Sequence, residues 1–273
     1  MLIGNKDFDL DKRTYIMGIL NLTPDSFSDG GKFNTIEAAL NHVERMLQEG
    51  ADIIDIGGES TRPNYTQVEE DDEIERVVPI IQEIRARFDC PISIDTYKAK
   101  VAERALQAGA NIINDVWGCK KDKELAKVAA AFDVPCILMH NREEINYQNF
   151  IEDMQSDLMA SIEIAYQAGV KKEKIILDPG VGFAKTYEQN LQVMKQLEEI
   201  CCMGFPVLLG TSRKSIIGLT LDLPVQERLE GTLATTVMGI IKGCKFVRVH
   251  DVKANKRAAV MTDAMIRGTK DNG

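Results

Sequence analysis

Residues 15–56 decide the fold, and they read YIMGILNLTPDSFSDGGKFNTIEAALNHVERMLQEGADIIDI. Short apolar, β-branched runs stand at both ends of this stretch, at 15–20 and 53–56, as expected for buried strands. Between them, apolar residues recur at the spacing that places them on one face of a helix: Ile36, Ala39, Leu40, Val43, Met46 and Leu47. The stretch therefore predicts a strand, a loop, an amphipathic helix and a second strand, the unit from which parallel sheets are built.

The same alternation continues to the end of the chain. Strand-sized runs follow at 92–94, 111–116, 136–139, 174–177, 207–209 and 246–249. Further helical patterns begin near Ile74, Lys98, Asp122, Ile151, Gln189, Val225 and Val252. Eight strands, each followed by a helix, favour an α/β fold of the (β/α)8 TIM barrel type over an open doubly wound sheet. Because no linker or low-complexity tract interrupts the pattern, we expect a single domain over residues 1–273.

Composition and charge exclude several classes of function. The chain is 44% hydrophobic, which is enough to bury a large core. A net charge of -9 repels a polyanion, so we expect no nucleic-acid partner. The apolar runs are strand-sized and the N-terminus has no basic leader, so we expect no membrane span or export signal. Six cysteines without a C-x-x-C pair support neither a zinc site nor a disulfide framework, and they predict a cytoplasmic protein.

Every predicted strand ends in polar side chains that can bind or react. They are Asn21, Asp55, Asp95, Asn114 with Asp115, His140, Asp178, Ser212 with Arg213 and Lys214, and Arg248 with His250 and Asp251. In a barrel these ends share one face, which is where active sites lie. A half-buried carboxylate is costly unless a ligand or partner binds it, so Asp95 and Asp178 are candidate binding groups. Asp55 is also consistent with capping the following helix.

A basic group follows the last two predicted strands and contains Arg213, Lys214, Arg248 and His250. Barrels often bind phosphate in this region, and in an acidic chain the group favours a small anion over a polymer. The three histidines stand at unrelated spacings, so they predict no transition-metal site. The segment 178–183, DPGVGF, lacks the third glycine of a dinucleotide fingerprint and predicts only a tight turn.

Seven segments match the motifs of one known family. They are MGILNLTPDSFSDGG (17–31), DIGGESTRP (55–63), SIDTYK (93–98), NDV (114–116), DPGVGF (178–183), SRKS (212–215) and RVHD (248–251). On these residues the chain resembles the bacterial dihydropteroate synthases over nearly its full length. The resemblance implies a pterin-binding barrel, a transferase of folate biosynthesis that joins 7,8-dihydropterin-6-ylmethyl diphosphate to 4-aminobenzoate, releasing pyrophosphate and forming 7,8-dihydropteroate. It also implies Mg²⁺ as cofactor and a homodimer formed through the last helices.

The resemblance assigns roles to individual residues. It places the pterin pocket at Asp95, Asn114, Met139, Asp178, Phe183 and Lys214. It places the diphosphate at Asn21, Thr61, Arg248 and His250, with Asn21 near the Mg²⁺. It places 4-aminobenzoate at Phe27, Thr61, Arg62, Pro63 and Ser212. Asp95, Lys214, Arg248 and His250 are the implied catalytic residues. The resemblance also points to Lys185 at the 4-aminobenzoate site, but Lys185 is left out of the assignment, because a cation after the glycine turn is also consistent with a solvated side chain.

The chemistry of the substrates suggests how such a site works. An arylamine is neutral at pH 7 and needs no general base before it attacks, so departure of pyrophosphate should limit the rate. Mg²⁺, Arg248 and His250 can stabilise the charge that develops on this leaving group. The hypothesis is a dissociative path through a pterin-methyl cation, which the carboxylate of Asp95 favours.

Two alternatives and one departure accompany this interpretation. A methyltetrahydrofolate-dependent corrinoid methyltransferase shares the pterin barrel but needs no diphosphate site, and segments 61–63 and 212–214 speak against it. A noncatalytic pterin-binding subunit is the second alternative, and the presence of Asn21, Arg248 and His250 speaks against it. The departure is Asn64, which stands where the family usually has glycine; asparagine tolerates a left-handed backbone well.

Overall fold

A ring of parallel strands forms the centre of the molecule. The computed structural model describes residues 1–22, 32–59 and 67–268. In this part of the chain, eight parallel strands form one sheet in the order β8-β7-β6-β5-β4-β3-β10-β9. A further parallel bridge between Leu177 and Val207 joins the first strand of this order to the last, so the sheet nearly closes. The strands are β3 (Tyr15–Asn21), β4 (Ile53–Gly57), β5 (Ile92–Asp95), β6 (Ile112–Asp115), β7 (Cys136–Met139), β8 (Ile175–Asp178), β9 (Leu208–Leu209) and β10 (Phe246–Val249).

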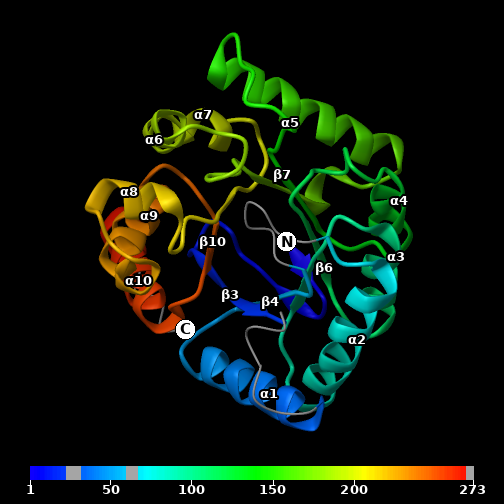
Figure 1. Ribbon diagram of the computed structural model, residues 1–273. Helices are drawn as coiled ribbons and strands as arrows, with labels where there is room; N and C mark the ends of the chain where they lie inside the picture. Colours follow the sequence, from blue (N-terminus) through cyan, green and yellow to red (C-terminus); the bar gives the residue numbers. More distant parts are fainter. Residues whose placement is uncertain (23–31, 60–66, 269–273) are drawn as a thin grey trace.

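Helices surround this barrel (Figure 1). They are α1 (Lys32–Gln48), α2 (Glu70–Arg87), α3 (Ala99–Gln107), α4 (Glu124–Ala131), α5 (Phe150–Gln167), α6 (Tyr187–Lys195), α7 (Leu197–Cys201), α8 (Ser215–Leu221), α9 (Leu229–Ile241) and α10 (Val252–Arg267). The apolar stripe expected on the first helix is buried at Ala39, Leu40, Val43 and Met46. The predicted TIM barrel is therefore confirmed. No helix of the described ranges is both long enough and apolar enough to cross a membrane.

The structure differs from the sequence pattern in several places, among them the break between α6 and α7 where one helix was expected near Gln189. Helix α1 begins at Lys32, so the loop expected over residues 21–35 ends earlier. Two helices, α8 and α9, follow β9 where one was expected near Val225, which instead lies in a short 3-10 turn. A hairpin of β1 (Leu2–Ile3) and β2 (Lys6–Asp7) precedes the barrel.

The hairpin closes one end of the barrel. Ile3 and Phe8 are buried in a cluster with residues from the starts of the strands, among them Tyr15, Ile112 and Phe246. The Phe8 and Tyr15 rings lie 4.5 Å apart between centroids. Because all the barrel strands run parallel, their polar carboxyl ends gather at the opposite end of the barrel.

Candidate active site

Strand register places the predicted polar residues side by side. In the sheet, Asn21 pairs with Gly57, Gly57 with Asp95, and Asp95 with Asn114, so these residues form one row across β3 to β6. Met139 pairs with Asp178 across β7 and β8. Since these are all last or near-last residues of their strands, the fold alone brings the predicted pterin residues to one rim.

Arg248 of β10 links two carboxylates across this rim. Its Nε donates to Asp55 Oδ2 at 2.6 Å, and its Nη2 donates to Asp95 Oδ2 at 2.7 Å. Asn114 Nδ2 also points to the Asp55 carboxylate, at 3.3 and 3.4 Å from its oxygens. Asp55 is fully buried, and the next helix begins only at Glu70. Asp55 is therefore a partner of Arg248 and not a helix cap, which corrects the capping interpretation.

The cluster of Asp55, Asp95 and Arg248 has more acid than base. Burial raises the pKa of Asp95 to about 7, although the Arg248 guanidinium opposes this effect, and the nearby Asp55 carboxylate adds to the rise. Asp95 Oδ1 is buried and has no hydrogen-bond partner among the described residues. A buried carboxylate oxygen without a donor is costly, so this atom is well placed to accept a hydrogen bond from a ligand.

Asp178 and Lys214 lie on the other side of the rim. Gly180 N donates to Asp178 Oδ1 at 2.7 Å, which fixes the carboxylate at the start of the turn after β8. The Lys214 ammonium donates to Val181 O and lies 4.7 Å from the centre of the Phe183 ring. Burial lowers the pKa of Lys214 to about 8, and the Asp178 carboxylate opposes this effect. With a pKa of about 8, the Lys214 ammonium keeps its proton at neutral pH and loses it at slightly alkaline pH.

An apolar wall lies beside these groups. Tyr97, Val116 and Met139 form a buried cluster, and Trp117 and Phe183 pack against it. The two predicted pterin walls, Met139 and Phe183, are therefore brought together. An aromatic and apolar surface next to buried carboxylates suits a flat heterocycle whose edge carries hydrogen-bond donors.

Ser212 and His250 face one another where the loops after β9 and β10 meet. Ser212 Oγ lies 3.0 Å from His250 Nδ1, and His250 N donates to the same hydroxyl at 3.2 Å. The neighbouring Arg213 forms a two-pronged ion pair with Asp251, at 3.0 and 2.7 Å. The charge of Arg213 is therefore compensated by Asp251, whereas Arg248 pairs with Asp55 and Asp95.

Lys185 is a buried residue that the assignment from the sequence left out. Its side chain is buried, and its ammonium donates to Gly180 O at 2.9 Å and to Phe183 O at 3.0 Å. It also lies 2.8 Å from His140 Nδ1, and burial lowers the pKa of Lys185 to about 7. The expectation of a solvated cation was wrong, because the turn after β8 folds over this side chain. The polar residue predicted at the end of β7, His140, was the available signal.

The segment that follows β4 contains Thr61, Arg62 and Pro63, which the resemblance assigns to the substrates. These residues and Phe27 lie outside the described part of the chain, so their assignments stay predictions. The residues on either side of this loop are described. Lys98 Nζ donates to Glu59 Oε2 at 2.7 Å and to Val68 O at 2.6 Å.

Lys98 also donates to Glu73 Oε2 of helix α2 at 2.7 Å, and all three charged side chains are buried. One buried ammonium therefore joins the chain before the loop to the chain after it. Sequence reasoning gave no indication of this contact, because the partners are far apart in the chain.

A metal site built entirely from protein side chains is not evident. In residues 1–22, 32–59 and 67–268, no three histidine, cysteine or acidic side chains gather in a way that could hold an ion. Asn21, the predicted Mg²⁺ residue, lies at the carboxyl end of β3 in the row with Asp95 and is partly exposed. It can offer one amide oxygen to an ion that takes its other ligands from substrate and water.

Comparisons with known proteins agree with this geometry. The family model described as "Pterin binding enzyme" matches residues 17–250. The dihydropteroate synthase of Clostridium beijerinckii is 65% identical to this chain, and the match covers 98% of this chain and 100% of the relative. The dihydropteroate synthase of Bacillus subtilis is 58% identical, and the match covers 93% of this chain and 90% of the relative. The crystal structure of the Clostridium difficile dihydropteroate synthase, obtained in the presence of pteroic acid, is 55% identical, covers 96% of this chain and 100% of its own, and superposes with a TM-score of 0.94. The chain belongs to the dihydropteroate synthase family of pterin-binding enzymes.

Proposed function

We propose that this chain condenses 7,8-dihydropterin-6-ylmethyl diphosphate with 4-aminobenzoate to give 7,8-dihydropteroate and pyrophosphate. The observation that carries the proposal is the pair of buried carboxylates, Asp95 and Asp178, on one rim with Lys214 and Arg248. Solved relatives support it. The Clostridium difficile structure was obtained in the presence of pteroic acid. The Xanthomonas albilineans dihydropteroate synthase, solved with 4-aminobenzoic acid, is 40% identical with a TM-score of 0.89 and covers 93% of this chain and 94% of its own chain.

The pterin ring would bind between the carboxylates and the apolar wall. Its amino-pyrimidinone edge presents adjacent N–H donors, and the Asp178 carboxylate can accept a pair of hydrogen bonds from them. Asp95 Oδ1, which has no partner among the described residues, can accept one further hydrogen bond from the ring. Because Asn114 Nδ2 is directed at Asp55, its amide oxygen is the group available to the ligand. Met139 and Phe183 would cover the ring faces.

The diphosphate would lie between Arg248, His250 and Asn21, with Thr61 contributing from the segment after β4. An amide oxygen of Asn21 together with diphosphate oxygens is a ligand set that suits Mg²⁺, which commonly keeps waters and takes one or two protein ligands. When bound there, Mg²⁺ would neutralise part of the charge on the departing pyrophosphate. The guanidinium of Arg248 would supply fixed donors to the same oxygens.

The reaction would begin with cleavage of the C–O bond, whose electron pair leaves with pyrophosphate. The methylene carbon then carries positive charge shared with the pterin ring, and the ionised Asp95 carboxylate favours that charge. The neutral amine of 4-aminobenzoate attacks this carbon, and the resulting ammonium loses one proton to solvent or pyrophosphate. Phe27, Thr61, Arg62, Pro63 and Ser212 would hold the aminobenzoate.

The oligomeric state forms part of the proposal, and a homodimer through the last helices fits the surface of the chain. Large apolar side chains are exposed on α8, α9 and α10, among them Leu219, Ile241, Met261 and Met265. Exposed large apolar side chains, where they gather into a patch, are expected to be covered by a partner. Sedimentation should therefore show twice the chain mass. We also propose a cytoplasmic location, as the cysteine content predicts.

Release of pyrophosphate is the measurement that separates this function from its alternatives. The purified protein should release pyrophosphate from dihydropterin diphosphate in a way that depends on 4-aminobenzoate. A corrinoid methyltransferase would release none and would consume methyltetrahydrofolate instead. A noncatalytic pterin-binding subunit would bind the pterin but leave the diphosphate intact.

A further inference from the structure

The turn that carries Lys214 into the active site has an unfavourable backbone. Ser212 and Lys214 point toward the rim, and Arg213 between them has a φ of 58°, in the left-handed region that favours glycine. A non-glycine residue in this region is strained and persists only when its surroundings hold it. The contacts that hold this turn therefore matter for the site.

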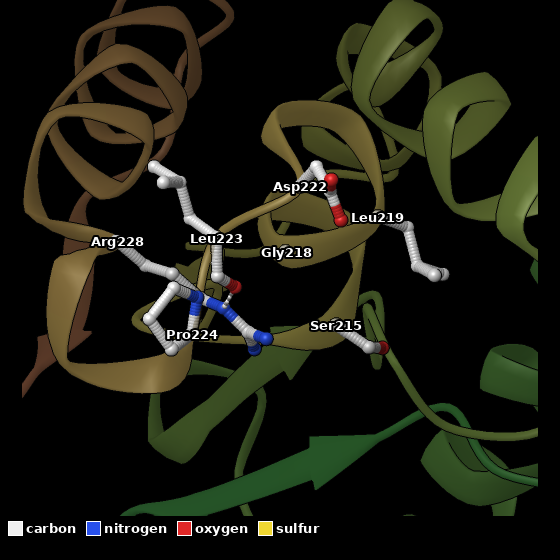
Figure 2. Close-up of a pocket in the computed structure, with 7 residues that line it drawn as sticks. All are labelled: Ser215, Gly218, Leu219, Asp222, Leu223, Pro224 and Arg228. Atoms are coloured by element: carbon white, nitrogen blue, oxygen red, sulfur yellow. Dashed lines mark hydrogen bonds between the residues drawn. The ribbon is translucent and has the colours of Figure 1, made fainter.

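The main contact comes from Arg228, which stands at the start of α9 on the outer side of the barrel. Its Nη1 donates to Arg213 O at 3.0 Å and lies 3.3 Å from Lys214 O, and its Nε donates to Leu223 O at 3.0 Å. Figure 2 shows the guanidinium beneath helix α8, beside Gly218 and Leu223. One side chain thus bonds to the backbone on both sides of α8.

Thr232, one turn further along α9, makes a second contact with the backbone of Arg213. Its hydroxyl accepts a hydrogen bond from Arg213 N at 3.1 Å and donates to Arg228 O at 2.8 Å. The amide and the carbonyl of Arg213 are therefore both bonded to the first turn of α9. The strained backbone is fixed from outside the pocket.

Gly218 makes room for the guanidinium. A Cβ at this position would lie 2.1 Å from Arg228 Nη2 and 2.3 Å from its Cζ, which is far inside van der Waals contact. Glycine in a helix interior is destabilising relative to alanine, by about 1 kcal/mol. Glycine at position 218 therefore has a structural reason: any larger residue would occupy the space that the Arg228 guanidinium fills. The pocket of about 390 Å³ on the outer surface leaves space into which a displaced guanidinium could swing.

We propose that Arg228 is a positioning residue of the active site, which holds the backbone of the turn at 212–214 so that the Lys214 ammonium stays beside Asp178 and the Phe183 ring. Within residues 1–22, 32–59 and 67–268, the Arg228 side chain bonds only to backbone carbonyls, and it lies behind the turn, so it acts through Lys214. The planar guanidinium reaches carbonyls in two directions at once, and a lysine ammonium at this position cannot reproduce that geometry. This role rests on the proposed function of the pocket.

Two substitutions remove the contact by different means. Arg228→Lys keeps the charge but loses the fork, and Gly218→Ala keeps the arginine but pushes its guanidinium out of its seat. We expect each to lower kcat/KM for the pterin diphosphate by roughly 10- to 100-fold, the loss typical of hydrogen bonds to a charged group. The two effects should not multiply in the double variant, because both break one contact. Gln226→Ala, an exposed position in the 3-10 turn just before Arg228, is the matched control and should keep the activity.

A readout on Lys214 separates positioning from a general loss of stability. In the wild type the Lys214 ammonium faces the carboxylates of Asp178 and Asp95 and the guanidinium of Arg248, and burial lowers its pKa. If the turn relaxes, the ammonium becomes more solvated. The alkaline limb of the pH profile should then move to higher pH in both variants.

Pterin binding by calorimetry keeps the two proposals distinct, since it needs no turnover. Weaker pterin binding by both folded variants, together with the shifted pH limb, supports the role of Arg228. If both variants lose activity only in proportion to their folded fraction, or keep the wild-type kcat/KM and pH profile, the role of Arg228 is refuted. An inactive wild-type protein would refute the proposed function instead.

Discussion

Replacing Asp95 by asparagine should stabilise the protein at alkaline pH while removing its activity. Asp95 shares a buried region with Asp55 and Arg248, so two carboxylates face one guanidinium, and Asp95 Oδ1 has no hydrogen-bond partner in the described residues. Ionised Asp95 is thus a costly group in the ligand-free protein. An amide has a similar shape and no charge, and Arg248 keeps Asp55 as its partner.

The size of the effect follows from the pKa of Asp95, which burial raises from 3.8 to about 7. Between pH 3.8 and about pH 7, the Asp95 carboxyl is therefore protonated in the folded protein and ionised in the unfolded chain. The free energy of unfolding therefore decreases as the pH rises through this window, by about 1.4 kcal/mol per pH unit. Between pH 5 and pH 8 the wild type should lose about 3 kcal/mol from this group. The Asp95→Asn variant should not show this loss.

Urea unfolding at pH 5 and pH 8 measures the difference. The unfolding free energy of Asp95→Asn relative to the wild type should increase by about 3 kcal/mol from pH 5 to pH 8. Asp71→Asn is the control, since it removes an exposed carboxylate that pairs with Lys100 and should change stability by less than about 1 kcal/mol at either pH. A variant that is less stable than the wild type by the same amount at both pH values would show that Asp95 stabilises the fold, and would refute the reasoning.

Three further predictions concern charge and bond breaking. The kcat/KM for the pterin diphosphate should rise with pH as Asp95 ionises near pH 7, and it should fall again as Lys214 loses its proton near pH 8. Lys214→Arg should abolish the decrease at alkaline pH, because arginine keeps its proton there; a variant that retains the decrease would contradict the assignment to Lys214. Lys98→Met leaves the buried Glu59 and Glu73 without a cationic partner and should lower the free energy of chemical unfolding by about 3 to 5 kcal/mol. Lys100→Met, at an exposed ion pair, should lower it by less than about 1 kcal/mol. Similar losses of unfolding free energy for the two variants would contradict the burial argument. If the path is dissociative, ¹⁸O in the bridging position of the pterin diphosphate should scramble on the enzyme with a non-nucleophilic aminobenzoate analogue bound, and Arg248→Ala should weaken the exchange; label that stays in the bridge would favour direct displacement by the amine.

The barrel could be predicted because its signal is local and repeated. Each inner strand is a short apolar run covered by helices, so a run such as 53–56 is distinctive even without a structure. The N-terminal hairpin could not be predicted, because its strands have only two residues each and are defined by packing against Tyr15 and Phe246. The separation of α8 from α9 was missed although its cause is local, since α8 ends at Asp222 in the left-handed region and Pro224 follows, which lacks the backbone N–H needed to continue a helix.

The site was predictable as far as strand ends define it. Asp95, Asn114 and Asp178 each end a strand or lie beside its end, and parallel register brings such residues to one rim. The partners of these residues were not predictable, because they come from contacts across the barrel. Arg248 bonds to Asp55 across 193 positions of the chain. Lys185 was misjudged for the same reason, since its burial depends on a turn that folds back toward His140.

Formation of 7,8-dihydropteroate by the purified protein is the most direct test of the central claim. With dihydropterin diphosphate, 4-aminobenzoate and Mg²⁺, mass spectrometry should detect 7,8-dihydropteroate in amounts equal to the pyrophosphate released. Asp178→Asn should remain folded and form little product, because one pterin donor would then face an amide donor in a buried site, at a cost of about 2 to 4 kcal/mol. A folded wild-type protein that forms no 7,8-dihydropteroate under these conditions, or an Asp178→Asn variant as active as the wild type, would contradict the account.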